Sequence, residues 1–102
     1  MNMKELMELL EKRQGNKSNE QFANEIGFRG STMWRYKNGK TGINNQKREM
    51  MIRYFSERGD TVMVGALLVY KTGSKFTEQE LDELGRLFLT RQQPAMALAP
   101  SR

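Results

Sequence analysis

The stretch SNEQFANEIGFRGSTMWRYKNGK, residues 18–40, decides the fold of this chain. Its first half predicts a short helix, because Ser18 and Gln21 form a capping box at its start and Gly27 can end it in a left-handed turn. After a brief turn, a second helix is predicted from Gly30 to Asn38. Two short helices joined by a tight glycine turn are typical of a helix-turn-helix.

The two predicted helices have distinct faces. In the first, a small alanine at Ala23 lets the helices cross closely, whereas a bulky side chain would push them apart. In the second, Met33 and Tyr36 are expected to turn inward. The opposite face then carries four polar or aromatic residues at i, i+3, i+4 and i+7, namely Ser31, Trp34, Arg35 and Asn38. A hydroxyl, an aromatic ring, a guanidinium and an amide on one exposed stripe suit the DNA major groove.

The chain resembles the Cro/repressor (XRE-like) family of helix-turn-helix proteins over about Leu6 to Tyr70. The matching positions are Phe22-Ala23, Gly27-Phe28, Ser31-Thr32-Met33, Arg35-Tyr36 and Asn38-Gly39-Lys40. Among the differences, Trp34 stands where small residues are common and Lys37 where many members carry glutamate. The resemblance implies an all-α fold, a five-helix bundle to which this chain adds a C-terminal amphipathic helix. It also implies a phage or mobile-element repressor that binds a palindromic operator as a homodimer, with half-sites about 34 Å apart.

Composition restricts the classes of function. The chain has 102 residues, which suits one domain with a modest core. It has neither cysteine nor histidine, so the usual zinc ligands and the commonest general base are missing, and we expect no metal, no cofactor and no enzyme activity. The longest apolar run, Val62 to Tyr70, is too short to span a bilayer, and no secretory signal pattern is present. We therefore expect a cytoplasmic protein.

The positive charge is concentrated in one part of the sequence. The net charge is +5, and the first 58 residues account for all of it. Between Glu25 and Glu49 there is no acidic residue, while six cations occur there: Arg29, Arg35, Lys37, Lys40, Lys47 and Arg48. Such a local positive field beside the recognition helix indicates a polyanionic partner, although a solvated basic loop is the alternative.

We expect the second helix to read bases and the flanking groups to hold phosphates. Arg35 is the strongest candidate, because arginine can bind O6 and N7 of guanine together, worth about 1–3 kcal/mol of discrimination. Trp34 would ordinarily belong to a core, but helical geometry directs it outward, toward a thymine methyl or the sugar-phosphate wall. The expected base contacts are Arg29, Gly30, Ser31, Trp34, Arg35 and Asn38, and the expected phosphate contacts are Lys17, Asn19, Thr32, Lys37, Lys40, Lys47 and Arg48.

Several of these assignments have simpler alternatives. Gly30 either lets the backbone approach the duplex or only eases the turn. Asn38 either binds adenine or helps to end the helix. Lys47 and Arg48 either contact phosphate or belong to a solvated face.

The rest of the chain predicts further helices. One spans about 2–13 and serves as scaffold, one spans 45–58, and a valine-rich run at 62–70 is assigned as helix on the family resemblance, with a strand as competitor. The predicted organisation is a helix-turn-helix domain at 1–70, a linker at 71–76, a C-terminal helix at 77–92 and a flexible tail at 93–102.

The predicted C-terminal helix has an apolar stripe formed by Leu81, Leu84, Leu87 and Phe88. An amphipathic face needs burial, so this stripe either packs on its own bundle or forms a dimer or partner seam. A second class of function follows from the latter possibility. The chain could be a protein-interaction module, such as an antitoxin or anti-repressor, that uses this stripe to bind another protein.

Overall fold

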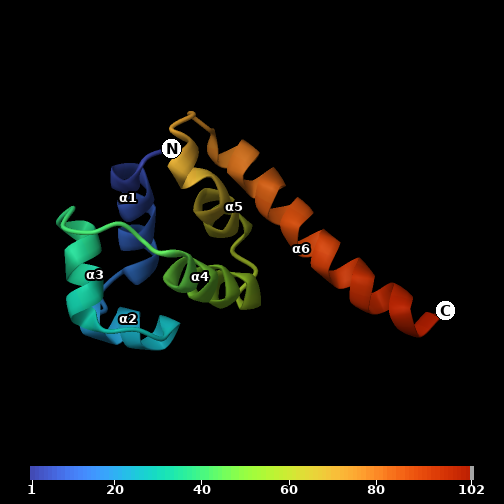
Figure 1. Cartoon of the computed structure of the whole chain (residues 1–102), viewed down its shortest axis with the longest axis horizontal. Helices are drawn as coiled ribbons and strands as arrows, with labels where there is room; N and C mark the ends of the chain where they lie inside the picture. Colours follow the sequence, from blue (N-terminus) through green and yellow to red (C-terminus); the bar gives the residue numbers. More distant parts are fainter. Residues whose placement is uncertain (102) are drawn as a thin grey trace.

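The computed structural model describes the backbone of residues 1–101 and the side chains of residues 1–91. The backbone forms six α-helices and one turn of 3-10 helix at Tyr70–Thr72 (Figure 1). The helices are α1 (Met3–Gln14), α2 (Asn19–Ile26), α3 (Gly30–Lys37), α4 (Asn45–Glu57), α5 (Thr61–Val69) and α6 (Glu78–Ser101). No strand occurs in residues 1–101, so the valine-rich run at 62–70 is helical as predicted.

Local sequence sets the helix boundaries. Oγ of Ser18 accepts a hydrogen bond from the amide of Gln21 at 3.0 Å, which starts α2 where the sequence predicts it. Asn44 and Asp60 cap α4 and α5 in the same way. Gly27 ends α2 with a φ of 127°, a conformation that residues with a side chain rarely adopt.

The helix pair α2–α3 packs tightly. Ala23 is fully buried, and Met33 and Tyr36 face the interior as predicted. A Cβ atom added to Gly30 would lie only 2.7 Å from Cα of Glu20, so the first turns of α2 and α3 are in near contact. The core behind this pair draws on every helix, and its largest fully buried side chains include Leu6, Leu10, Phe22, Met33, Met51, Phe55, Met63, Leu67 and Leu81.

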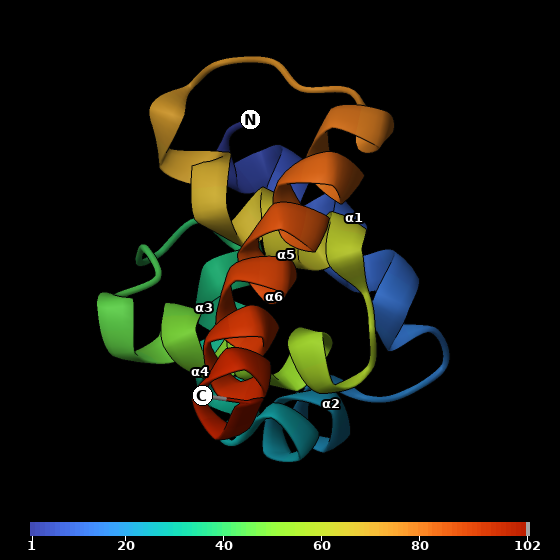
Figure 2. The ribbon, with the colours of Figure 1, turned by 90° about the vertical axis from the view of Figure 1, so that its right-hand side faces the viewer.

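The helices α5 and α6 cross at two glycines. A Cβ atom on Gly65 would lie 1.9 Å from the carbonyl oxygen of Leu81, and one on Gly85 would lie 1.9 Å from that of Thr61. The two helices therefore run antiparallel with their backbones in direct contact, which no residue but glycine permits. Figure 2 shows α6 in front of α5.

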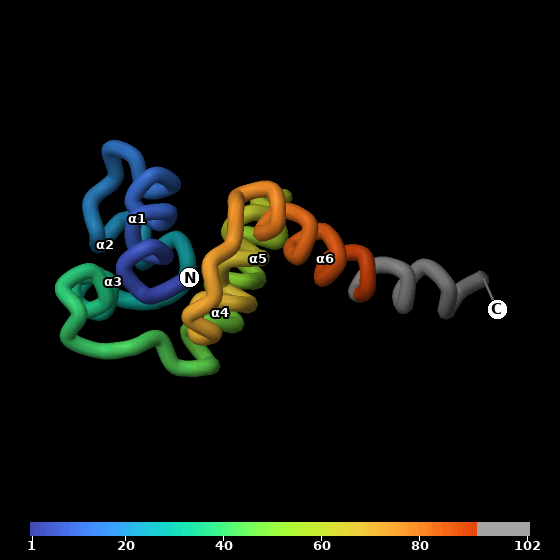
Figure 3. Tube along the Cα trace, turned by 90° about the horizontal axis from the view of Figure 1, so that it is seen from above, coloured from blue at the N-terminus to red at the C-terminus, as the bar shows by residue number. Residues whose placement is uncertain are grey.

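The helix α6 projects beyond the bundle in Figure 1, and Figure 3 shows its coloured part leaving the bundle beside α5. Its backbone continues to Ser101, past the end expected at residue 92. The side chains of the tail expected at 93–102 lie outside the described residues. None of the helices in the described part of the chain is long and apolar enough to cross a bilayer.

Candidate nucleic-acid interface

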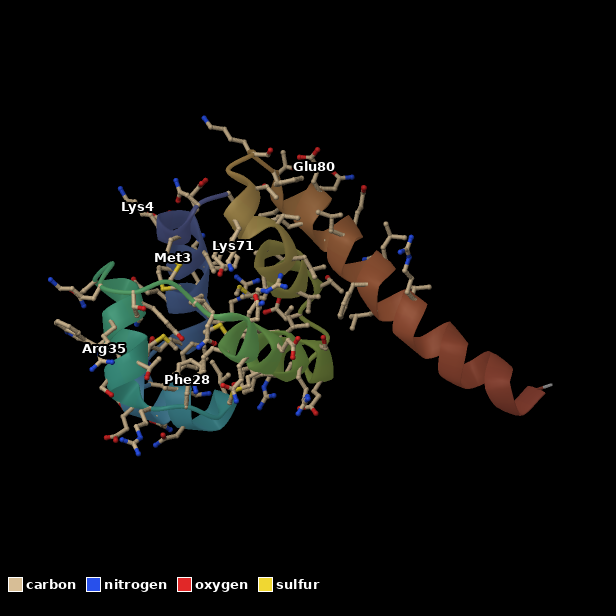
Figure 4. All side chains as sticks on the ribbon, viewed as in Figure 1. Met3, Lys4, Phe28, Arg35, Lys71 and Glu80 are labelled. Carbon is tan, nitrogen blue, oxygen red and sulfur yellow. The ribbon has the colours of Figure 1, made fainter. Side chains whose placement is uncertain are left out.

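The outward face of α3 is the most distinctive surface of the molecule. Ser31, Trp34 and Arg35 are exposed on this helix, and Arg29 is exposed at its N-cap. Trp34 is 51% exposed, although burying so large an apolar side chain usually stabilises a protein. Figure 4 shows Arg35 on α3, at the side of the molecule opposite α6.

The arginine side chains at this face have no bonding partner within the described residues. Within the described residues, neither Arg29 nor Arg35 makes a side-chain hydrogen bond or an ion pair, and Arg29 forms no capping bond to α3. Lys40 lies three residues beyond the end of α3 and is also exposed. Their charges are therefore available to a partner. No acidic residue lies between Glu25 and Glu49 in the sequence, but Glu20 of α2 lies against Gly30, the neighbour of Arg29.

Two of the expected base contacts have structural tasks. Gly30 faces Glu20, so its missing side chain serves the α2–α3 contact, and packing accounts for the glycine without any base contact. Nδ2 of Asn38 donates to the carbonyl oxygen of Trp34 at 2.8 Å, a second bond to an oxygen that also accepts from the backbone N–H of Asn38 at 3.0 Å. The second hydrogen on Nδ2 and the amide oxygen of Asn38 remain available to adenine.

A polar cluster beneath α3 joins three helices. The ammonium of Lys37 donates to Oε1 of Gln14 and, at 2.7 Å, to Oδ1 of Asn19. Nε2 of Gln14 in turn donates to the backbone oxygen of Lys17 at 2.7 Å and to Oδ1 of Asn19 at 3.1 Å. Gln14 is the one buried polar side chain among those that the structure describes. The cluster therefore connects the ends of α1 and α3 to the start of α2.

Two of the expected phosphate contacts, Lys37 and Asn19, make hydrogen bonds within this cluster. Lys37 is half-buried and its ammonium is directed at amide oxygens rather than at solvent. The amide oxygen of Asn19 accepts from both Lys37 and Gln14, so Nδ2 is the polar atom that Asn19 retains for an external group. The sequence pattern gave no role to Gln14, because an isolated polar residue at the end of an amphipathic helix carries no spacing signal.

A second polar cluster fixes α2 against α4. Nζ of Lys17 donates to Oε1 of Glu25 at 2.8 Å, and the hydroxyl of Tyr54 donates to the same oxygen at 2.9 Å. The guanidinium of Arg58 stacks on the ring of Tyr54 at 3.6 Å from its centroid. The hydrogen bonds from Lys17 and Tyr54 lower the pKa of Glu25 below its ordinary value. Lys17 is thus in an ion pair and is not a free phosphate ligand in this structure.

The remaining expected phosphate contacts differ among themselves. Nη1 of Arg48 donates to the carbonyl oxygen of Leu67 at 3.2 Å, and its Nε atom is buried, so this arginine supports the C-terminal part of α5. Lys47 is half-buried, with its ammonium 5.9 Å from the ring centroid of Phe28. Thr32 is half-buried on α3.

The apolar stripe of α6 is divided between two environments. Leu81 is fully buried, and Leu84 and Phe88 are half-buried, with Phe88 packed against the core. Leu87 is 57% exposed. The stripe therefore packs mostly on its own bundle, and Leu87 is the member that it leaves to solvent.

Comparison of the chain with protein-family models, curated proteins and solved structures gives no significant match.

Proposed function

We propose that this protein is a sequence-specific DNA-binding regulator of the helix-turn-helix kind, with α3 as its recognition helix. The observation that carries the proposal is the exposed face of α3, which presents the half-exposed Trp34 and the unpaired Arg35 on consecutive residues. An arginine reads guanine in the major groove, and an apolar ring suits the methyl group of thymine.

The supporting structure is suited to presenting this face rigidly. Glycine and alanine bring α2 and α3 into near contact, and the Gln14–Asn19–Lys37 cluster ties both helices to α1. A recognition helix held in this way loses little conformational freedom on binding, which favours affinity and specificity.

The charges support a polyanionic partner at the same face. Arg35 lies on the exposed stripe of α3, with Arg29 before the helix and Lys40 after it. The sequence between Glu25 and Glu49, which holds all three, has no acidic residue. In this proposal they neutralise backbone phosphates or contact base edges, and the protein binds a two-fold symmetric operator as a dimer and acts as a repressor.

The protein-interaction module is the weaker candidate. It requires the stripe from Leu81 to Phe88 to be open to a partner, whereas Leu81 is buried and Phe88 packs on the core. Only the outer side of α6 is free for such a role.

A titration with random-sequence duplexes at a series of salt concentrations tests the proposed interface. Affinity should fall steeply with salt, and Arg29→Ala, Arg35→Ala and Lys40→Ala should each weaken binding and reduce the salt slope. Lys75→Ala removes an exposed cation from the α5–α6 linker and is the matched control, because it should leave binding unchanged. Equal effects of all four substitutions would mean that net charge alone attracts DNA and that α3 is not the interface.

A further inference from the structure

One side of α6 has no partner within the described residues. Gly85 faces α5, and Leu87 lies two residues further, about 200° around the helix axis, so it points away from the bundle. Glu83 and Arg91 are exposed and lie four residues before and after Leu87, on the same outer face. In Figure 2 this helix lies nearest the viewer.

The outer face of α6 is complementary to itself. Read in the forward direction it gives acid, leucine and base at positions 83, 87 and 91; read backward it gives base, leucine and acid. Two such helices placed antiparallel with Leu87 at the centre would set Glu83 of each copy opposite Arg91 of the other. Parallel alignment would instead set acid against acid and base against base, which is unfavourable.

We propose that a second copy of this chain covers the outer face of α6, in an isologous antiparallel contact whose two-fold axis passes beside Leu87. The occupant follows from the charge pattern, because two-fold symmetry requires a patch that is complementary to itself. The contact withdraws the one exposed leucine of this face from water and forms two Glu83–Arg91 ion pairs. It holds whether or not the protein binds DNA.

The dimer formed in this way is weak and sensitive to salt. One leucine from each chain supplies little apolar area, and the flanking ion pairs are exposed and screened by electrolyte. The dimer should therefore dominate at high protein concentration and low salt.

Single cysteines test the geometry, because the natural chain has none. In the proposed contact only position 87 faces its own symmetry mate, so Leu87→Cys should form a disulfide-linked dimer under mild oxidation. Neither Glu83→Cys nor Arg91→Cys should link to itself, but an equimolar mixture of the two variants should give the mixed dimer. Ready self-linking at position 83 would overturn the antiparallel register, and absence of linking at position 87 would overturn the contact.

Charge reversal gives a second test that does not depend on cysteine chemistry. Glu83→Arg turns both ion pairs into repulsions and should raise the dissociation constant about tenfold at low salt, as measured by sedimentation equilibrium. Arg91→Glu should do the same, and the double variant should return to within about threefold of the parent, because the pairs are then restored in reverse. Glu11→Arg and Lys12→Glu on the exposed side of α1 are the matched controls. Double-variant dimers as weak as the single ones would contradict the pairing.

Discussion

The ammonium group of Lys37, at the last residue of α3, donates a hydrogen bond to Oδ1 of Asn19, 2.7 Å away at the first residue of α2. Through Gln14 the same ammonium is connected to the end of α1. A residue that the sequence predicts as a phosphate contact therefore holds α3 in place.

The substitution Lys37→Met separates these two roles. It shortens the side chain by one atom and removes the charged donor from Asn19 and Gln14, so it should lower the free energy of unfolding by about 1–2 kcal/mol in urea denaturation. Lys40→Met changes an exposed lysine and should leave stability within about 0.5 kcal/mol of the parent. Unchanged stability of Lys37→Met, together with a smaller salt slope for DNA binding, would return Lys37 to the phosphate contacts.

Trp34 should recognise the methyl group of thymine. Replacing the contacted thymidine by deoxyuridine removes only this methyl group. The parent should then bind about fourfold more weakly, which corresponds to the loss of about 0.8 kcal/mol for one buried carbon group. Trp34→Ala should bind the two duplexes with equal affinity. Binding by the parent that does not distinguish thymine from deoxyuridine at any position would place Trp34 on the sugar-phosphate wall instead.

The crossing of α5 and α6 depends on Gly85. An alanine there would force its Cβ atom to within 1.9 Å of the carbonyl oxygen of Thr61, so Gly85→Ala should lower the free energy of unfolding by about 1–3 kcal/mol. The intrinsic helix preference of alanine acts in the opposite direction, which makes the sign of the effect informative. Thr90→Ala, at an exposed position of the same helix, should be neutral or slightly stabilising.

Stability should decrease in acid because of Glu25. Hydrogen bonds from Lys17 and Tyr54 lower the pKa of this carboxyl in the folded state, and Arg58 lies close enough to contribute in the same direction. Its contribution is therefore present above the ordinary value of about 4.5 and is lost as the pH falls through the lower pKa of the folded state.

Denaturation at a series of pH values checks this. Glu25→Gln should flatten the acid limb of the stability curve, whereas Glu49→Gln, which removes an exposed carboxylate on α4, is the control. The same acid limb in the parent and in Glu25→Gln would show that the cluster has no part in it.

Dimerisation through α6 restricts how one DNA duplex can be bound. Layers of packed helices separate the outer face of α6 from α3, and Figure 1 shows these two helices on opposite sides of the molecule. With helix axes about 8–10 Å apart in each layer, the two recognition helices of such a dimer would lie roughly 60 Å apart. Because Arg35 lies on the side of the molecule opposite α6, the two α3 faces of this dimer would also point away from each other, so a straight operator with half-sites one turn apart would not fit both. A spacing of one turn would contradict the α6 contact and leave the role of α3 intact.

The short-range features of this fold are accessible from the sequence. Capping residues such as Ser18 and stop glycines such as Gly27 act over a few residues, so the helix boundaries in residues 18–40 are confirmed closely. The direction of Trp34 also follows from local geometry, since Met33 and Tyr36 determine the buried face of α3.

The long-range features are not accessible in the same way. The contact between Lys37 and Gln14 spans 23 residues, and neither side chain shows a pattern that names its partner. Gly65 and Gly85 are an exception, because glycine inside a helix is itself a sequence signal of close packing. A glycine inside a helix costs about 1 kcal/mol relative to alanine, so two of them indicate a close helix crossing, and with it the burial of Leu81.

Selection of bound duplexes from a random DNA pool, at low and at physiological salt, tests the central claim most directly. The parent should enrich a two-fold symmetric motif at both salt concentrations, and Arg35→Ala should lose the preference for one guanine within each half-site while keeping the rest of the motif. Enrichment of no sequence, with binding that only fades as salt rises, would mean charge-driven association and would contradict base recognition by α3.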